Sequence, residues 1–359
     1  MPGKVLAMEP YFGGSHKSFL NGLTGVLAGG MDLITLPARK WKWRMRLSGP
    51  WLANELALLA NPEDYCCLLC STFVDVATLK GLMPEWARRL PVVTYFHENQ
   101  FAYPVRFEKA GDVQFTLTNV TTALASDRLA FNSHYNLETF LDGYRRVVKR
   151  AKDMRLVNVE EELRAKSCII HPGQDFSLID QDVSLKGEGE SPVIIWNHRW
   201  EHDKNPEQFF TALFELDRRQ IDFKLVVMGE SFRDHPAVFD EARERLSHRI
   251  LKIGYAESRK EYCQWLRQGD VVLSTAGHEF FGISVVEAVR AGCRPLLPNR
   301  LSYPELFPNE YLYEDDELVD KLIETLGQGR LAAEKAIPLT ERFSWQVVGN
   351  QYHDWLFGR

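Results

Sequence analysis

Two glutamates, Glu279 and Glu287, lie eight residues apart on either side of a predicted helix start. The apolar run 271–275 predicts a buried strand, and a helix is expected from about Ile283. Gly282 lies just before this helix, whose free N–H groups and positive dipole end favour a phosphate. Carboxylates accept hydrogen bonds from vicinal hydroxyls, so the pattern suggests a ligand with a sugar, a phosphate and a ribose. A plain strand–helix unit with two solvated glutamates explains the segment equally well.

Two cations follow an earlier predicted strand, residues 193–196. Arg199 and Lys204 come after this strand and before a helix that begins near Pro206. A guanidinium can bind a diphosphate through two hydrogen bonds, and an ammonium adds a point charge. Together with the two glutamates they predict an anion site in the second half of the chain.

Polar residues also follow strands in the first half. A glycine pair, Gly13 and Gly14, joins the strand 4–10 to a helix that contains His16. Such a turn can bind an anion, although many glycine turns are only tight connections. The strands 92–96 and 129–131 are followed by further polar residues: His97, Glu98, Asn99, Asn132 and Ser133. Ligands of open α/β sheets bind at this edge, so we expect a second set of contacts there.

A dense basic–aromatic stretch follows the strand 33–37. It consists of Arg39, Lys40, Trp41, Lys42, Trp43, Arg44 and, after one methionine, Arg46. Cations can hold phosphates while indole rings stack on bases or sugars. A basic loop whose tryptophans pack on the domain is an equally weighted interpretation.

The length and the alternation of elements predict two domains. The chain has 359 residues, which is long for a single core. Strands recur with helices between them in both halves, which predicts two parallel sheets with helices on both faces. The composition between residues 175 and 192 is typical of a linker. We therefore expect an N-terminal domain (1–178), a C-terminal domain (179–340) and a C-terminal helix (341–359) that packs back across the junction.

Charge and composition are those of a globular enzyme. The formal net charge is −6, with 21 Lys and Arg against 18 Asp and Glu in residues 1–178. The first half is thus mildly basic, which suits an anionic partner. We expect no membrane span, no signal peptide, a cytoplasmic protein and no metal. Six cysteines include a CxxC at Cys67 and Cys70, which we interpret as part of a core strand and not as a zinc site.

Taken together, the glycine turn, the Arg-x4-Lys pair and the Glu-x7-Glu pair resemble those of GT-B glycosyltransferases, in particular the retaining family four. The resemblance implies an α/β fold of two Rossmann-like domains with a donor and acceptor cleft between them. It implies that Glu279 binds the hydroxyls of the donor sugar, that Glu287 holds the nucleotide ribose, and that His97 lies beside the sugar. The implied catalytic residues are His97, Arg199, Lys204 and Glu279. The implied donor contacts are Gly13, Gly14, Arg199, Lys204, Gly229, Tyr255, Glu279, Phe281, Gly282, Ile283 and Glu287.

Four longer strings, EPYFGGSH, YFHENQFAYP, FNSHYN and WNHRWEHDKNP, resemble the tRNA-queuosine α-mannosyltransferase family. This resemblance implies that a hexose, mannose from GDP-mannose, is transferred with retention to queuosine in tRNA, with no cofactor beyond the nucleotide-sugar donor. The expected acceptor contacts are His16, Glu98, Asn99, Asn132, Ser133, Arg39, Lys40, Trp41, Lys42, Trp43 and Arg44.

Two other classes of function remain open. The same fold could act on a lipid, a glycan or a small molecule, or it could be a non-catalytic scaffold that binds tRNA or a nucleotide. A glycosidase is disfavoured, because Glu279 and Glu287 at one helix start are poorly placed to flank a bond from opposite sides. The sequence leaves the nucleotide base, the hexose, the tRNA and the oligomeric state undetermined.

Overall fold

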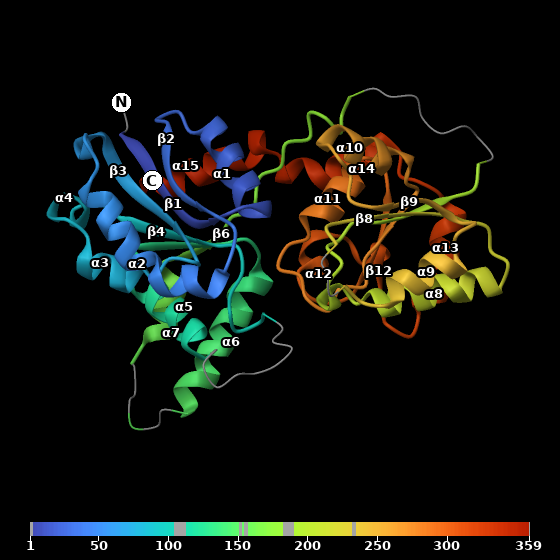
Figure 1. Cartoon of the computed structure of the whole chain (residues 1–359), viewed down its shortest axis with the longest axis horizontal. Coiled ribbons are helices and arrows are strands. Elements are labelled where there is room, and N and C mark those ends of the chain that lie inside the picture. The colour runs from blue at the N-terminus through green and yellow to red at the C-terminus, as the bar shows by residue number, and fades with distance from the viewer. Residues whose placement is uncertain are drawn as a thin grey trace. The chain divides into compact units, whose positions relative to one another are not determined.

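The computed structural model describes residues 3–103, 113–150, 153, 157–181, 190–231 and 235–358. The chain divides into two compact units (Figure 1). Unit 1 consists of Met1–Gln174 and Trp345–Arg359, and unit 2 is Asp175–Ser344. The division thus falls four residues before the predicted boundary of 178, and the last helix belongs to unit 1. Part of the predicted linker, residues 182–189, lies outside the described residues.

Unit 1 contains a six-stranded sheet whose neighbouring strands are all parallel, in the order β2-β1-β3-β4-β5-β6. Its strands are β1 (Lys4–Phe12), β2 (Met31–Pro37), β3 (Tyr65–Ser71), β4 (Val92–Phe96), β5 (Arg128–Phe131) and β6 (Ser167–Ile169). Its helices are α1 (Gly14–Val26), α2 (Trp41–Ala57), α3 (Val76–Leu82), α4 (Glu85–Arg88), α5 (Val113–Ala125), α6 (His134–Arg150), α7 (Val159–Ala165) and α15 (Trp345–Phe357), with the 3₁₀ turn η1 (Pro62–Asp64). Because all strands run the same way, their carboxyl ends lie along one edge.

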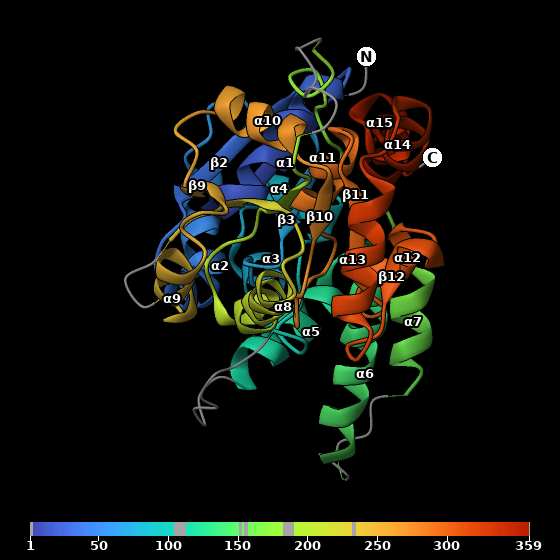
Figure 2. The same ribbon diagram turned by 90° about the vertical axis from the view of Figure 1, so that its right-hand side faces the viewer.

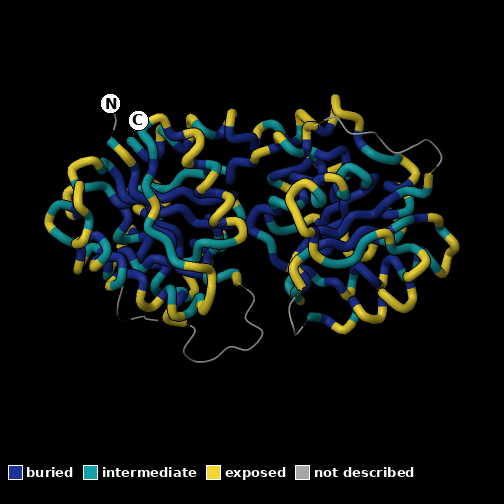
Figure 3. The backbone as a smooth tube through the Cα atoms, turned by 45° about the horizontal axis from the view of Figure 1, so that its top comes forward, coloured by how far each residue is buried: buried dark blue, intermediate teal, exposed yellow. Residues whose placement is uncertain are grey.

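Side chains of the unit 1 strands alternate between two cores. Val5 and Ala7 of β1 pack with α1 and α15, whereas Leu6 and Met8 of the same strand pack with α2 and α3. This alternation is the two-residue period of a strand that is covered on both faces. Figure 3 shows the buried strands inside each unit.

Helix α15 is held on unit 1 by Trp345. A Cβ atom at Gly22 would lie 2.0 Å from the Trp345 Nε1 atom, and one at Gly173 would lie 2.2 Å from its Cδ2 atom. The indole ring therefore needs both glycines. Further along the helix, the Tyr352 hydroxyl donates to the His171 carbonyl at 2.9 Å. The final helix is thus an integral layer of the first unit.

Unit 2 contains a second parallel sheet, in the order β12-β11-β10-β7-β8-β9. Its strands are β7 (Val193–Trp196), β8 (Lys224–Met228), β9 (Ile250–Gly254), β10 (Val271–Leu273), β11 (Arg294–Pro298) and β12 (Leu312–Tyr313). Its helices are α8 (Pro206–Arg218), α9 (Val238–Arg245), α10 (Arg259–Gln268), α11 (Ile283–Arg290), α12 (Tyr303–Leu306), α13 (Leu318–Gln328) and α14 (Ala333–Thr340), with the 3₁₀ turns η2 (His202–Lys204), η3 (Asn309–Tyr311) and η4 (Glu341–Phe343).

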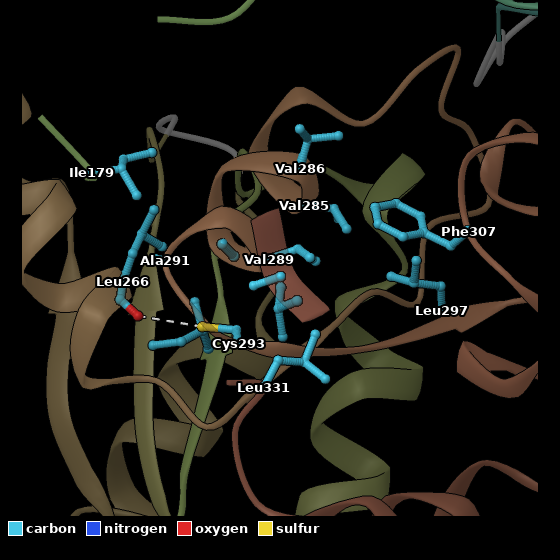
Figure 4. Packing of buried hydrophobic residues seen from close by; sticks show 14 of the residues in the cluster. Ile179, Leu266, Val285, Val286, Val289, Ala291, Cys293, Leu297, Phe307 and Leu331 are labelled. Atoms are coloured by element: carbon cyan, nitrogen blue, oxygen red, sulfur yellow. Dashed lines mark hydrogen bonds between the residues drawn. The ribbon is translucent and has the colours of Figure 1, made fainter. Parts of the chain in front are cut away.

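The unit 2 sheet is also covered on both faces. Helices α8 and α9 lie side by side (Figure 2) and form one core with α13. Helices α10, α11 and α14 form the other core. In this second core Val285 and Val289 of α11 pack in one cluster with Leu297 and Phe307 (Figure 4). The packing fixes the direction in which α11 begins at the carboxyl edge of the sheet.

The predicted fold class, α/β with two Rossmann-like sheets, is confirmed. Most predicted strands agree with the structure to within about two residues at either end. Strand β12 was not predicted. Among the described residues, no helix is both long enough and apolar enough to cross a bilayer.

Candidate active site

The loop between β10 and α11 carries the first of the two glutamates to the carboxyl edge of the unit 2 sheet. Gly282, directly before α11, has a φ of 97°, a backbone conformation that favours glycine. Its missing side chain also leaves room for Tyr303, whose ring carbon would lie 3.1 Å from a Cβ atom at this position. The first N–H groups of α11 have no partner within the helix, so they are available to an anion.

Lys204 is a buried cation next to this loop. Its ammonium donates to the His278 carbonyl at 2.8 Å and lies 3.2 Å from a Glu279 carboxylate oxygen and 3.3 Å from an Asp203 carboxylate oxygen. Burial alone would lower the pKa of Lys204, but the two carboxylates raise it above the ordinary value. Lys204 is therefore a permanent charge that is fixed by the fold.

Glu279 stays ionised because the Lys204 ammonium lies next to it. Burial would raise the pKa of its carboxyl, but the Lys204 ammonium holds it below the ordinary value. A carboxylate has room for about four hydrogen bonds, and Glu279 uses one oxygen for Lys204 and the other for the Phe280 N–H. Two acceptor positions remain, which is what a pair of vicinal sugar hydroxyls needs.

Two residues that the sequence analysis missed hold Lys204 in place. The Asp203 carbonyl accepts from the backbone N–H groups of Gly277 and His278, which ties turn η2 to the β10–α11 loop. The Asp203 carboxylate lies 3.7 Å from the His278 ring. Burial would raise the pKa of Asp203, but His278 and Lys204 hold it well below its ordinary value. Neither residue belongs to the Arg-x4-Lys or Glu-x7-Glu pair from which the donor site was predicted.

Glu287 is anchored by α10. One of its carboxylate oxygens accepts from Arg259 at 2.5 Å, and the other accepts from the Tyr262 hydroxyl at 2.9 Å. Tyr262 in turn accepts from Asn197, directly after β7. Arg259 and Tyr262 were also missed by sequence reasoning, because they lie 28 and 25 residues before Glu287. The carboxylate retains acceptor capacity for further hydrogen-bond donors.

The remaining predicted donor contacts differ in exposure. Arg199 is exposed and lies 3.1 Å from Glu201, so it can reach an anion. Tyr255 is 70% exposed after β9. In contrast, the Phe281 side chain is 2% exposed and belongs to the hydrophobic core, so its side chain does not line a ligand site. Ile283 is half-buried against the same core.

Gly229, at the end of β8, is required by packing. Its φ is 151°, and a Cβ atom there would lie 1.8 Å from the His198 carbonyl oxygen. The close approach of two strand ends explains the glycine without a ligand. Burial, followed by the nearby Lys204 charge, lowers the pKa of His198 to about 4, so this ring is neutral.

At the carboxyl edge of the unit 1 sheet, His16 lies between two carboxylates. Its Nδ1 atom is 2.8 Å from Glu9 and its Nε2 atom is 3.3 Å from Glu98. Burial would lower the pKa of His16, but the two carboxylates raise it to about 10. The His97 ring lies 4.1 Å from the His16 ring, centroid to centroid. Burial, and then the His16 charge, lower the pKa of His97 well below its ordinary value, so His97 is neutral.

Three residues that were predicted to contact the acceptor instead hydrogen-bond to other parts of unit 1. They are Asn99, Asn132 and Ser133. Asn99 is fully buried, and its amide bonds to Asn136, Thr139 and the backbone of the following turn. Asn132 donates to the His97 carbonyl at 2.7 Å. Ser133 is buried and accepts from the Asn136 N–H at the start of α6. These side chains are directed into unit 1, so they position the loop after β4 and do not offer groups to an acceptor.

The two glycines after β1 have different roles. A Cβ atom at Gly13 would lie 2.5 Å from the Ala38 Cβ atom, so Gly13 is required by packing. Gly14 has a φ of 49° and open space where a side chain would be. Gly14 therefore leaves the start of α1 accessible to a ligand.

The basic–aromatic stretch is helical from Trp41 onward, where α2 begins. Trp41 packs on Phe115 at 5.1 Å, and Lys42 and Arg46 lie over the same Phe115 ring. Trp43 remains 59% exposed. Both interpretations of the stretch thus hold in part, because one tryptophan packs on the domain and the other faces solvent.

The other cations of this stretch differ in exposure. Arg39 and Lys40 are exposed, whereas Arg44 is half-buried and donates to the Pro37 carbonyl at 3.4 Å. Within the described ranges, no group of three or more His, Cys, Asp or Glu side chains is placed to hold a metal ion. Cys67 and Cys70 are free and buried, and burial raises the pKa of the Cys67 thiol to about 12.

Comparisons with known proteins show the family and the fold of the chain. Residues 4–174 match the family described as tRNA-queuosine alpha-mannosyltransferase N-terminal, and residues 180–334 match Glycosyl transferases group 1. A tRNA-queuosine alpha-mannosyltransferase of Drosophila melanogaster is 37% identical over 325 residues, which cover 88% of this chain and 85% of that protein.

Solved structures share the fold. The Anabaena protein HepE in complex with UDP has a TM-score of 0.73 at 16% identity, covering 99% of this chain and 100% of that one. The sucrose-phosphate synthase of Thermosynechococcus elongatus has a TM-score of 0.70 at 13% identity, covering 98% of both chains. The two sheets and the sequence match define a GT-B glycosyltransferase. Within this class, the chain belongs to the tRNA-queuosine α-mannosyltransferase family.

Proposed function

We propose that this glycosyltransferase moves mannose from GDP-mannose to queuosine in a tRNA anticodon, with retention of configuration and without a metal. The acceptor is supported by the 37% identity to the Drosophila tRNA-queuosine alpha-mannosyltransferase over 88% of the chain. A nucleotide-sugar donor is supported by the ionised Glu279, which lies beside the buried Lys204 near the start of α11. In this proposal the Lys204 ammonium binds the diphosphate and the Glu279 carboxylate, 3.2 Å from it, accepts from the sugar hydroxyls.

The proposed mechanism assigns one task to each group of residues. Lys204, Arg199 and the N–H groups at the start of α11 bind the diphosphate and stabilise the negative charge that develops as it leaves. Glu279 orients the hexose, and Glu287 orients the ribose. The departing phosphate takes the acceptor proton, so no side chain of the protein acts as the base or the nucleophile.

A transfer assay tests the acceptor. The purified protein is incubated with radiolabelled GDP-mannose and with bulk tRNA from cells grown with or without queuosine. We expect label only in tRNA that contains queuosine. Label in neither tRNA, with tight binding of GDP-mannose, would overturn the acceptor and direct attention to lipid or glycan acceptors. If neither GDP nor UDP sugars bind, the donor proposal fails and a scaffold role is favoured.

The linkage of the product tests the stereochemistry. The mannose of GDP-mannose is α-linked, so retention gives an α-mannoside. We expect an α-mannosidase to release the label from the tRNA and a β-mannosidase to leave it in place. The reverse result would mean inversion and would contradict the role given to the leaving phosphate.

The start of α2 is the proposed tRNA surface, and a charge-matched pair of variants tests it. Arg39 and Lys40 are exposed after the carboxyl end of β2. Replacing both with serine is expected to weaken tRNA binding. The slope of the logarithm of the binding constant against the logarithm of the salt concentration should become shallower by about one unit per lost phosphate contact. The control replaces Arg88 and Arg89, which are exposed before the amino end of β4, with serine. Equal salt slopes for the two variants would remove Arg39 and Lys40 from the interface.

A further inference from the structure

A buried ionic triad lies at the carboxyl edge of the unit 1 sheet, next to His97. Its members are Glu9 on β1, His16 on α1 and Glu98 after β4. The Glu9 side chain is 2% exposed and the His16 side chain 7%, whereas the Glu98 side chain is 15% exposed. Glu98 is therefore the member that a ligand can reach, and the other two form a layer behind it.

Both carboxylates of the triad are oriented by additional hydrogen bonds. The Tyr11 N–H donates to Glu9 at 2.7 Å, which leaves the other Glu9 oxygen for His16. The Thr72 hydroxyl donates to one Glu98 oxygen at 3.1 Å, and His16 contacts the other at 3.3 Å. Each Glu98 oxygen thus keeps one acceptor position, and the two together suit a pair of neighbouring hydroxyls.

We propose that Glu9 and His16 are positioning residues, which hold the Glu98 carboxylate and the His97 ring in one arrangement for the acceptor hydroxyls. This inference rests on the proposed transfer to a hydroxyl acceptor. Glu98 then accepts hydrogen bonds from the acceptor, while the neutral His97 ring beside it contributes no competing charge.

The charges around His16 explain how the triad holds Glu98 and His97 in place. The ionisable groups that face it are Glu9 from β1, Glu98 and His97 from the loop after β4, and Tyr11, whose ring lies 6.4 Å away. Two carboxylates against one imidazolium leave a net negative charge that Glu98 presents to the site. Because the pKa of His16 is raised to about 10, we expect the imidazolium to persist through neutral and mildly alkaline pH.

The test replaces Glu9 with glutamine, which keeps the shape and removes the charge. The introduced amide can still accept from the Tyr11 N–H through its oxygen, and its nitrogen can donate to His16, which favours the neutral ring. The protonation of His16 is followed by NMR of the histidine-labelled protein, with His16→Gln for assignment. In the wild type we expect His16 to stay protonated from pH 6 to 9. In Glu9→Gln we expect it to titrate within this range.

The kinetic readout is kcat/KM for the acceptor between pH 6 and 9. The wild type is expected to show no inflection from His16. Glu9→Gln is expected to lose activity on the alkaline side, by roughly tenfold or more, because a small misplacement of positioning groups is costly. Glu63→Gln, which removes an exposed carboxylate from the same unit, serves as the control with an unchanged profile. A uniform loss across the pH range, with His16 titrating, would mean a purely structural role and overturn the inference.

Two further measurements distinguish a variant that does not fold from a wrong inference or a wrong proposed function. If Glu9→Gln does not fold, Thr72→Val removes only the hydroxyl that orients Glu98. We then expect KM for the acceptor to rise while the titration of His16 is unchanged, and an unchanged KM would contradict the inference. If the wild type transfers nothing to queuosine-containing tRNA, the proposed function fails. The NMR titration, which needs no substrate, still reports on the triad.

Discussion

Replacing Lys204 with methionine tests whether a single buried cation holds the donor site together. The Lys204 side chain is 8% exposed and lies within 3.3 Å of two carboxylates, Asp203 and Glu279. Methionine has a similar length but no charge, so both carboxylates would remain buried without a cation. Breaking a buried ion pair from one side costs about 3–5 kcal/mol. For a unit of this size, such a loss lowers Tm by roughly 10 °C.

A second lysine of the same unit provides the control. Lys252 lies 2.9 Å from Glu261, but both of these side chains are about a quarter exposed. Exposed pairs contribute little, so Lys252→Met is expected to shift Tm much less. Thermal unfolding of the two variants side by side is the assay. Equal shifts would refute the view that Lys204 compensates buried charge.

The pH dependence and a double variant sharpen the test. Without Lys204, the buried carboxyls of Glu279 and Asp203 are expected to have raised pKa values, because burial is no longer opposed by the ammonium. Lys204→Met should therefore regain stability relative to the wild type as the pH falls towards 4. Adding Glu279→Gln should recover part of the loss, because it removes one uncompensated charge. Additive losses would contradict the coupling between the two residues.

Two more results are expected. Glu279→Gln should reduce transfer by roughly 10²–10³-fold while GDP binds almost as before, because the proposed partner of Glu279 is the sugar. Transfer assays and calorimetry measure the two effects. An equal loss of transfer and of GDP binding would contradict this role of Glu279. The pKa of His16 is raised from 6.5 to about 10, so its contribution to stability is complete below about pH 6.5 and is lost as the pH rises through 10. Urea unfolding should accordingly show a deficit of His16→Gln that is larger at pH 6 than at pH 10, and a constant deficit would contradict the assigned charge.

The elements of the fold could be predicted because their signals are local. Strand β7 occupies the residues that the apolar run predicts, and α11 begins at Ile283 as expected. Gly282, with its positive φ, likewise agrees with the predicted helix start. The two-residue strand β12 was missed, since two residues carry no periodicity. Parallel sheets bring all strand ends to one edge, which is why so many polar residues could be placed there in advance.

The roles of individual side chains were harder to predict. Asn99 and Asn132 have the chemistry of ligand contacts, but their partners lie about 35 residues away and turn them inward. In the Glu9–His16–Glu98 triad, His16 contacts a glutamate that lies 82 positions further along the chain. A sequence shows which residues can hydrogen-bond, whereas the choice of partner is decided by the tertiary packing of several loops. Packing also explains Gly13 and Gly229, which a motif alone would assign to a ligand.

The place of α15 has a consequence for how the protein is made. Trp345, Tyr352 and Trp355 cover a face of the first sheet, beside Tyr95 of β4, yet they are synthesised after the whole of unit 2. At a rate of roughly 5–20 residues per second, the ribosome needs about 10–30 s to make the intervening segment. For that time the part of the sheet face that α15 covers would be exposed apolar surface, which is a typical binding site for chaperones. A messenger that is truncated before residue 345 would make this exposure permanent, so its product would be expected to be degraded even though unit 2 is complete.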